Sequence, residues 1–135
     1  MSEYDALIAA ATRGRENAHA KFSNFKVGAA LHTPSGKIYT GCNVENATYG
    51  LTVCAERVAI FKAISEGERK FDSIAVVTDT DTLTPPCGAC RQLLAEYAPR
   101  AKVWVADTRA LRASREFSVA ELLPAAFVEV PVDSD

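Results

Sequence analysis

The fold of this chain is decided by residues 73–106, which read SIAVVTDTDTLTPPCGACRQLLAEYAPRAKVWVA. The run 73–78 is short, apolar and continuous, which is typical of a strand buried on both faces. A helical pattern over about 87–97 follows Pro85-Pro86, and 101–106 has the composition of another strand. A strand, a helix and a second strand in this order predict a parallel pair joined by a crossover helix.

The sequence before this stretch predicts a helix, a hairpin and another helix. Apolar residues recur at helical spacing within 3–20. Strands over 27–32 and 37–43 flank Thr33-Pro34-Ser35-Gly36, a turn sequence that predicts a hairpin. A helix is predicted over roughly 53–66, with Gly67 placed to end it.

The sequence after this stretch is less regular. Residues 107–116 are basic and irregular, with an edge strand expected only near Phe117. Ser118 and Glu121 have the spacing of a capping box, which predicts a short helix ending at Pro124. We therefore predict one α/β layered domain over 1–135, with an acidic, loosely held tail from about 128 to 135.

Composition excludes several classes of protein. A chain of 135 residues with 48% apolar and 24% charged residues is typical of one soluble globular domain. A net charge of −2 with interspersed signs argues against binding of nucleic acid or anionic membranes through a basic face. No apolar run approaches the roughly 20 residues that span a bilayer, and residues 1–5 lack the features of a signal peptide. We expect a cytoplasmic protein with reduced cysteines, which favours metal or redox chemistry over disulfides.

Three of the four cysteines form a pattern suited to zinc. Cys54 is followed by Glu56, and Cys87 and Cys90 stand three residues apart on the first turn of a predicted helix, where they share one face. If the two central helices pack side by side on the sheet, their N-termini converge. Three protein ligands with an open position describe a zinc ion that activates water, whereas a structural site needs four.

Charge near these cysteines is the second part of the prediction. Three thiolates make zinc a weaker Lewis acid, but each helix N-terminus carries about half a positive elementary charge that offsets them. Arg57 or Arg91 could donate to the ligand sulfurs, or could only pair with surface carboxylates. Glu56 is better placed to move the proton of a metal-bound water than to bind the metal. The structural alternative needs a fourth ligand, for which the candidates are Cys42, His19 and His32.

Four blocks of sequence together resemble a known family. They are FSNFKVGAAL at 22–31, GCNVENATYGLT at 41–52, CAER at 54–57 and PCGACRQ at 86–92. A ligand-x-Glu element followed by Pro-Cys-x-x-Cys is the pattern of the zinc deaminases. The chain is similar, over about 4–127, to the small homotetrameric cytidine deaminases with three cysteine ligands. The resemblance implies a three-layer α/β/α fold with a mixed five-stranded sheet and helices on both faces.

The resemblance also implies roles for single residues. Cys54, Cys87 and Cys90 would bind one Zn²⁺ per subunit, and Glu56 would shuttle protons. Asn43 and Glu45 would hold the ribose hydroxyls, Phe25 would pack on the pyrimidine, and Ala55 would belong to the same substrate-binding set. Ala47, Tyr49 and Phe127 would reach the nucleoside of a neighbouring subunit. Without the resemblance, Asn43 and Glu45 could face solvent, and Phe25 and Phe127 could be core or interface aromatics.

Two positions depart from the family. Phe22 stands where a tyrosine is common, so any role of a hydroxyl there is lost. Pro85 stands where a serine is common, which removes an N–H donor and stiffens the loop. These changes leave open how modified cytosines are tolerated.

The activity implied is hydrolytic deamination of cytidine and 2′-deoxycytidine to uridine and 2′-deoxyuridine plus ammonia, a step of pyrimidine salvage. Water activated by zinc would attack C4, and Glu56 would pass its proton to N3 and then to the amino group. One alternative is a deaminase of the blasticidin S type, although Asn43 and Glu45 suit an unmodified ribose. Another is deamination of nucleic acid, which a tetrameric site closed by Tyr49 and Phe127 disfavours. A third is a non-catalytic binding module stabilised by zinc, with Cys42 as the fourth ligand.

Overall fold

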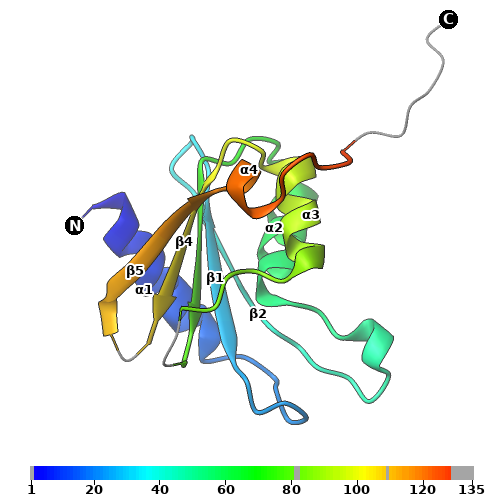
Figure 1. Cartoon of the computed structure of the whole chain (residues 1–135). Helices are drawn as coiled ribbons and strands as arrows, with labels where there is room; N and C mark the ends of the chain where they lie inside the picture. Colours follow the sequence, from blue (N-terminus) through cyan, green and yellow to red (C-terminus); the bar gives the residue numbers. More distant parts are fainter. Residues whose placement is uncertain (1, 81–82, 109, 129–135) are drawn as a thin grey trace, which may run out of the picture.

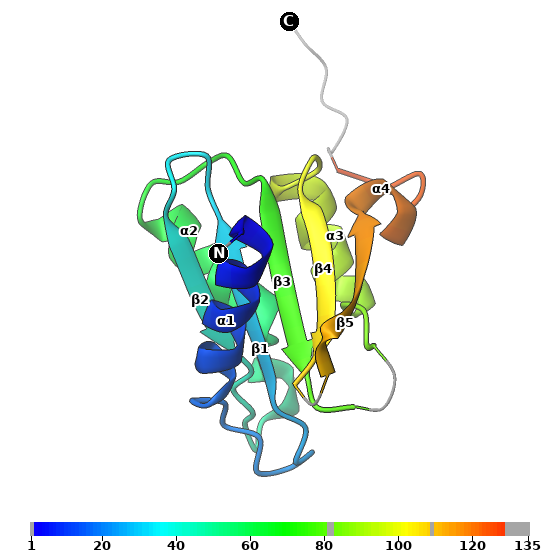
Figure 2. The same cartoon turned by 90° about the vertical axis from the view of Figure 1, so that its left-hand side faces the viewer.

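A five-stranded sheet forms the centre of the computed structural model, which describes residues 2–80, 83–108 and 110–128. Its strand order is β2-β1-β3-β4-β5, seen face on in Figure 2. Along the chain the elements are α1 (Glu3–Arg15), β1 (Val27–His32), β2 (Ile38–Cys42), the 3₁₀ turn η1 (Tyr49–Leu51), α2 (Ala55–Ser65), β3 (Ser73–Thr78), α3 (Gly88–Tyr97), β4 (Lys102–Asp107), β5 (Ala110–Ser118) and α4 (Val119–Leu122).

The strand directions determine where the helices begin. β1 is antiparallel to both β2 and β3, with Ala29 opposite Gly41 and Val76. β2 and β3 therefore run in the same direction, and both end at one edge of the sheet. β3 and β4 are parallel and joined through α3, which confirms the predicted crossover, while β5 is antiparallel to β4.

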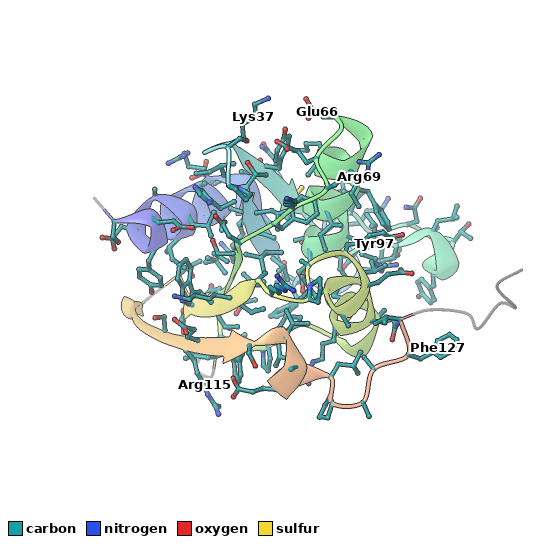
Figure 3. All side chains as sticks on the ribbon, turned by 90° about the horizontal axis from the view of Figure 1, so that it is seen from above. Lys37, Glu66, Arg69, Tyr97, Arg115 and Phe127 are labelled. Carbon is teal, nitrogen blue, oxygen red and sulfur yellow. The ribbon has the colours of Figure 1, made fainter. Side chains whose placement is uncertain are left out.

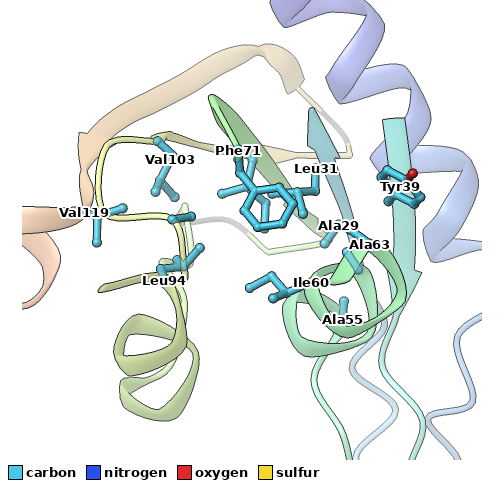
Figure 4. Packing of buried hydrophobic residues seen from close by; sticks show 14 of the residues in the cluster. Ala29, Leu31, Tyr39, Ala55, Ile60, Ala63, Phe71, Leu94, Val103 and Val119 are labelled. Atoms are coloured by element: carbon cyan, nitrogen blue, oxygen red, sulfur yellow. The ribbon is translucent and has the colours of Figure 1, made fainter. Parts of the chain in front are cut away.

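Helices cover both faces of the sheet (Figure 1). On one face α1 buries Leu7, Ile8, Ala10 and Ala11 against small residues of β1, β3 and β4. On the other face α2 and α3 bury a larger apolar cluster that includes Ile60, Leu94 and Val103 (Figure 4). All six residues of β3 are buried, as expected for a strand covered on both sides. The arrangement confirms the α/β/α fold with a mixed five-stranded sheet.

Two predictions about element boundaries are wrong. Residues 110–116 are not irregular, because β5 spans Ala110–Ser118 and pairs with the whole of β4, and the edge strand expected near Phe117 is the end of this longer strand. The basic residues mask the strand in the sequence, since an edge strand needs an apolar pattern on one face only. α1 ends at Arg15 and not near 20, because the chain then turns so that the His19 N–H donates to the Asn43 carbonyl at 2.9 Å.

Other boundary predictions are confirmed. α4 begins with the capping box of Ser118 and Glu121, and Gly67 follows α2 with a φ of 98°, in the region that favours glycine. The tail predicted from about 128 falls mostly on 129–135, outside the described residues. In the described part of the chain, none of the helices has the length and apolarity needed to cross a membrane.

Side chains at the start of α1 hold it to the sheet. Ser2 and Asp5 form a capping box. His32, at the end of β1, places its Nδ1 atom 2.6 Å from Asp72 Oδ1 and 3.0 Å from Glu3 Oε1. These contacts join α1, β1 and the segment before β3 at the edge of the sheet opposite the helix N-termini of α2 and α3.

Two glycines allow the helices to lie close to the sheet. A Cβ added at Gly28 would lie 2.0 Å from the carbonyl oxygen of Ala11 in α1. A Cβ added at Gly41 would lie 2.3 Å from the carbonyl oxygen of Ala55, at the start of α2. The contacts involve backbone atoms, which cannot move aside as a flexible side chain can. Gly28 and Gly41 therefore determine how closely α1 and the first turn of α2 approach the strands.

We predict that Gly28→Ala lowers the free energy of unfolding by about 3 kcal/mol or more, because α1 must move away from β1 to accept the methyl group. Thermal unfolding followed by circular dichroism measures the effect. Gly50→Ala is the control, since a Cβ there meets no atom within 4 Å. Equal melting temperatures for Gly28→Ala and the parent protein would contradict the prediction.

Candidate active site

The three motif cysteines lie at the N-termini of two helices. Cys54 is the N-cap residue of α2, Cys87 is the N-cap residue of α3, and Cys90 lies in the first turn of α3. Because β2 and β3 end at the same edge of the sheet, the loops that follow them deliver both helix N-termini to one place. The sequence prediction that the two helix N-termini converge is confirmed.

The spacing of the sulfur atoms fits a tetrahedral zinc site. Cys54 Sγ lies 3.8 Å from Cys87 Sγ, and the three Sγ atoms lie within 4.8 Å of one another. Zinc–sulfur bonds of about 2.3 Å at tetrahedral angles place two sulfurs about 3.8 Å apart. The donor set and its spacing therefore fit one Zn²⁺ ion. Among the described residues, Cys42 is not part of this cluster.

Hydrogen bonds and burial shift the pKa values of Cys54 and Cys90 in opposite directions. Hydrogen bonds from Cys90, Arg57 and Cys87 lower the pKa of Cys54 to about 5, against the opposing effect of burial. The hydrogen bond with Cys54, together with burial, raises the pKa of Cys90. Of these two thiols, Cys54 therefore ionises first.

The two arginines differ in what they contact. Arg57 Nη2 donates to Cys54 Sγ at 3.5 Å and to the Thr52 carbonyl at 3.3 Å. Its Nε atom is buried and has no hydrogen-bond partner among the described residues. Arg91 donates to the carbonyls of Pro86 at 2.7 Å and Leu122 at 3.0 Å. Of the two, therefore, only Arg57 is placed by these contacts to offset thiolate charge, whereas Arg91 ties α3 to the loop before it and to α4.

Glu56 is a buried carboxyl group beside the cysteines, with 4% of its surface exposed. Burial, and to a smaller extent the negative charge of Cys54, raises the pKa of Glu56 to about 7. A carboxylate is costly to bury unless a cation or a hydrogen-bond donor compensates it. Its position therefore marks a group that can take up and release a proton in a site shielded from bulk water.

A cavity of about 220 Å³ opens above Glu56 and the cysteines. Its walls contain eight of the residues singled out in the sequence, namely Phe25, Asn43, Glu45, Cys54, Ala55, Glu56, Cys87 and Pro85, the last of which departs from the family. Sequence reasoning did not single out the other lining residues, which are Val27, Thr52, Val53, Val76, Thr78 and Thr84. Several of them adjoin motif residues in the sequence, and that proximity is the one signal that could have found them.

The residues on the outer wall bond to one another. Asn43 Nδ2 donates to the Phe25 carbonyl at 2.7 Å, and Asn43 Oδ1 accepts from the Val27 N–H at 2.9 Å. Glu45 Oε1 accepts from the N–H groups of Phe22 and Ser23, both at 3.0 Å. Asn43 and Glu45 therefore do not simply face solvent, because both hold the segment that carries Phe25.

Three predicted site residues lie away from the cavity of their own chain. Ala47 and Tyr49 belong to the loop before α2, which extends away from the sheet in Figure 1, and 77% of Tyr49 is exposed. Phe127 is 64% exposed and projects outward beyond α3 in Figure 3. Phe22, one of the two departures noted above, packs edge-on against Tyr49 with ring centroids 6.2 Å apart. The rings of Phe22 and Tyr49 thus lie together in the exposed loops before β1 and α2, whereas Phe127 lies beside α3, where its carbonyl accepts from Gln92 Nε2.

Comparison with known proteins identifies the family. The family model described as "Cytidine and deoxycytidylate deaminase zinc-binding region" matches residues 1–106. The chain belongs to this deaminase family. A cytidine deaminase of Halalkalibacterium halodurans is 51% identical to it over 126 residues, which are 90% of this chain and 91% of that protein. A cytidine deaminase of Sporosarcina psychrophila is 47% identical over 125 residues, 93% of this chain and 91% of that protein.

The similarity to cytidine deaminases is also found in the three-dimensional structure. The crystal structure of cytidine deaminase from Burkholderia pseudomallei superposes with a TM-score of 0.88 at 49% identity, covering 94% of this chain and all of that one. The family is zinc-binding, which agrees with the three-cysteine cluster built from α2 and α3.

We predict that Cys54→Ser lowers the zinc content of the purified deaminase to a small fraction of the parent value, because it removes one of the three sulfur ligands. Zinc is measured by mass spectrometry after dialysis against a chelator. Cys42→Ser is the matched control and should keep its zinc, since Cys42 lies outside the sulfur cluster. If both variants lost zinc equally, Cys42 would be a fourth ligand and the site would be structural.

Proposed function

We propose that this chain is a zinc-dependent cytidine deaminase, which hydrolyses cytidine and 2′-deoxycytidine to uridine and 2′-deoxyuridine with release of ammonia. The observation that carries the proposal is the buried carboxyl group of Glu56 between a three-cysteine cluster and a cavity with polar groups at its outer wall. The small cavity suits a single nucleoside better than a polymer.

Cys54, Cys87 and Cys90 would hold the zinc ion. When bound, zinc supplies a Lewis acid that makes water a nucleophile near neutral pH. The N-termini of α2 and α3 and the guanidinium group of Arg57 offset the charge of the three thiolates. These positive groups thus reduce the negative charge of the three thiolates, which would otherwise weaken the metal as a Lewis acid.

Glu56 would move the protons of the reaction. It takes one proton from the attacking water, gives it to N3 of the cytosine ring, and later carries a second proton to the amino group that leaves C4. The C4–oxygen bond forms, the C4–nitrogen bond breaks, and the sum of water and cytidine gives uridine and ammonia. Burial of Glu56 shields these transfers from bulk water.

The outer wall would orient the nucleoside. The ring of Phe25 and the side chains of Val27 and Val76 offer apolar contact to the base. Asn43 and Glu45 offer hydrogen-bonding groups to the sugar. Since this pair suits an unmodified ribose, cytidine is favoured over blasticidin S, and comparing turnover of the two compounds tests that preference.

We further propose that residues 1–135 act as one cytoplasmic domain that assembles into a homotetramer. Support for assembly comes from the exposed rings of Tyr49 and Phe127, which lie outside the cavity of their own chain. Reduced thiols, which a three-cysteine metal site requires, are maintained in the cytoplasm. Ala47, Tyr49 and Phe127 would complete the site of a neighbouring subunit.

We predict that Glu56→Gln keeps the fold and the zinc content but lowers kcat by at least about a hundredfold, because the amide cannot accept a proton from water. The fall in ultraviolet absorbance of cytidine measures turnover, with the chelator-treated parent protein as a further inactive control. Near-normal turnover by Glu56→Gln with full zinc occupancy would rule out the proposed role. An inactive, zinc-loaded parent protein would rule out the proposed function.

We predict that activity is regained when two impaired variants share one tetramer. Phe127→Ala should raise KM several-fold, because an aromatic contact from a neighbouring subunit is lost. Mixed with Glu56→Gln subunits, it should form some sites that have both Glu56 and a neighbour's Phe127. Kinetics after co-refolding should show a component with the parent KM, and an activity equal to the sum of the separate variants would contradict the shared site.

A further inference from the structure

The carboxylate of Glu45 is held by the segment that precedes β1. Its Oε1 atom accepts two backbone hydrogen bonds, from Phe22 and Ser23, each 3.0 Å long. Its Oε2 atom accepts the hydroxyl hydrogen of Ser23. A carboxylate offers about four acceptor positions, so roughly one remains, and it lies on Oε2.

The direction of the Ser23 hydroxyl is determined by its other contact. The N–H of Phe25 donates to Ser23 Oγ at 3.0 Å. Since one side of the hydroxyl oxygen accepts this N–H, its single hydrogen is free to point at Glu45 Oε2. The Phe25 carbonyl is held in turn by Asn43 Nδ2. Asn24, between Ser23 and Phe25, has a φ of 57°, a left-handed conformation that asparagine tolerates and that brings the two contacts together.

These contacts hold both carboxylate oxygens of Glu45 and leave one acceptor position beside the cavity that it lines. We propose that Ser23 is a positioning and specificity-determining residue, whose hydroxyl orients Glu45 so that its remaining acceptor position receives a hydroxyl group of the sugar. The proposal rests on the function proposed above. It assigns to Ser23 no contact with the substrate, since the hydroxyl acts through Glu45.

The same hydrogen bonds also stabilise the ionised form of Glu45. The hydrogen bond from the Ser23 side chain is the largest cause that lowers the pKa of Glu45, followed by the bond from the Ser23 N–H. Glu45 therefore stays ionised as an acceptor at neutral pH. A merely structural role for Ser23 would instead affect every substrate equally, because it would loosen the whole segment that carries Phe25.

The test compares cytidine with 2′,3′-dideoxycytidine. The dideoxy compound lacks the 2′- and 3′-hydroxyl groups of the sugar, and therefore lacks the proposed partner of Glu45. For the zinc-loaded full chain, Ser23→Ala should raise KM for cytidine about tenfold and change kcat less than threefold, as expected for a lost hydrogen bond to a charged group. For the dideoxy compound kcat/KM should change less than twofold. Ser35→Ala, which removes a hydroxyl from the turn between β1 and β2, is the matched control.

Equal losses on both nucleosides, or no loss on cytidine, would overturn the proposal. If Ser23→Ala folds poorly, Ser23→Thr and Ser23→Val replace it, since threonine and valine have nearly the same shape as each other and only threonine keeps the hydroxyl. Only the valine variant should then lose discrimination between the two nucleosides. Parent protein that leaves cytidine unchanged would instead refute the proposed function, and this inference with it. An active parent together with a Ser23→Ala variant that loses activity equally on both nucleosides, or on neither, would refute the role of Ser23 alone.

Discussion

The convergence of two helix N-termini at one edge of the sheet is the constraint on which the site depends. It arises because β2 and β3 run in the same direction on either side of β1, so that the loops leading to α2 and α3 leave from the same edge. Cys54 and Cys87 cap these helices, and Cys90 follows within one turn. The backbone N–H groups at each helix start provide a positive potential where three thiolates must gather. A metal site rich in negative charge therefore becomes compatible with a buried carboxyl group beside it.

Close packing fixes the positions of the two helix N-termini. Gly41 lets the first turn of α2 approach β2 to within contact of backbone atoms, and Arg91 ties the start of α3 to the loop before it and to α4. A rigid sheet with all six residues of β3 buried supports both helices. The outer wall is organised differently, since Glu45 accepts from the N–H groups of Phe22 and Ser23, and Asn43 both donates to and accepts from the backbone of 25–27. The end of the cavity at the three-cysteine cluster thus belongs to regular elements, whereas the end at Asn43 and Glu45 belongs to two loops held by polar contacts.

Much of the fold could be predicted because it depends on local sequence patterns. The buried strand at 73–78, the crossover helix and the capping box at Ser118 follow from hydrophobic period and capping chemistry, and all agree with the structure. An edge strand was expected near Phe117, but most of the length of β5 was missed, because an edge strand with basic side chains lacks a strong apolar pattern. Arg57 and Arg91 could not be distinguished, because the partner of a long flexible side chain depends on where distant elements lie. The contact of Glu45 with Ser23, 22 residues earlier in the chain, has no local signal at all.

The sequence by itself determined the chemistry of this protein: three thiols and a carboxyl group in a spacing that only a few kinds of site use, together with the family blocks around them. Those features are local, since a motif places its residues on one turn or one loop. The tertiary structure alone decided that the three Sγ atoms lie within 4.8 Å of one another, that Glu56 is buried, and that Glu45 accepts a hydrogen bond from Ser23. The physical reason is that distances between segments and the exclusion of water exist only after the sheet and its two helical layers have packed.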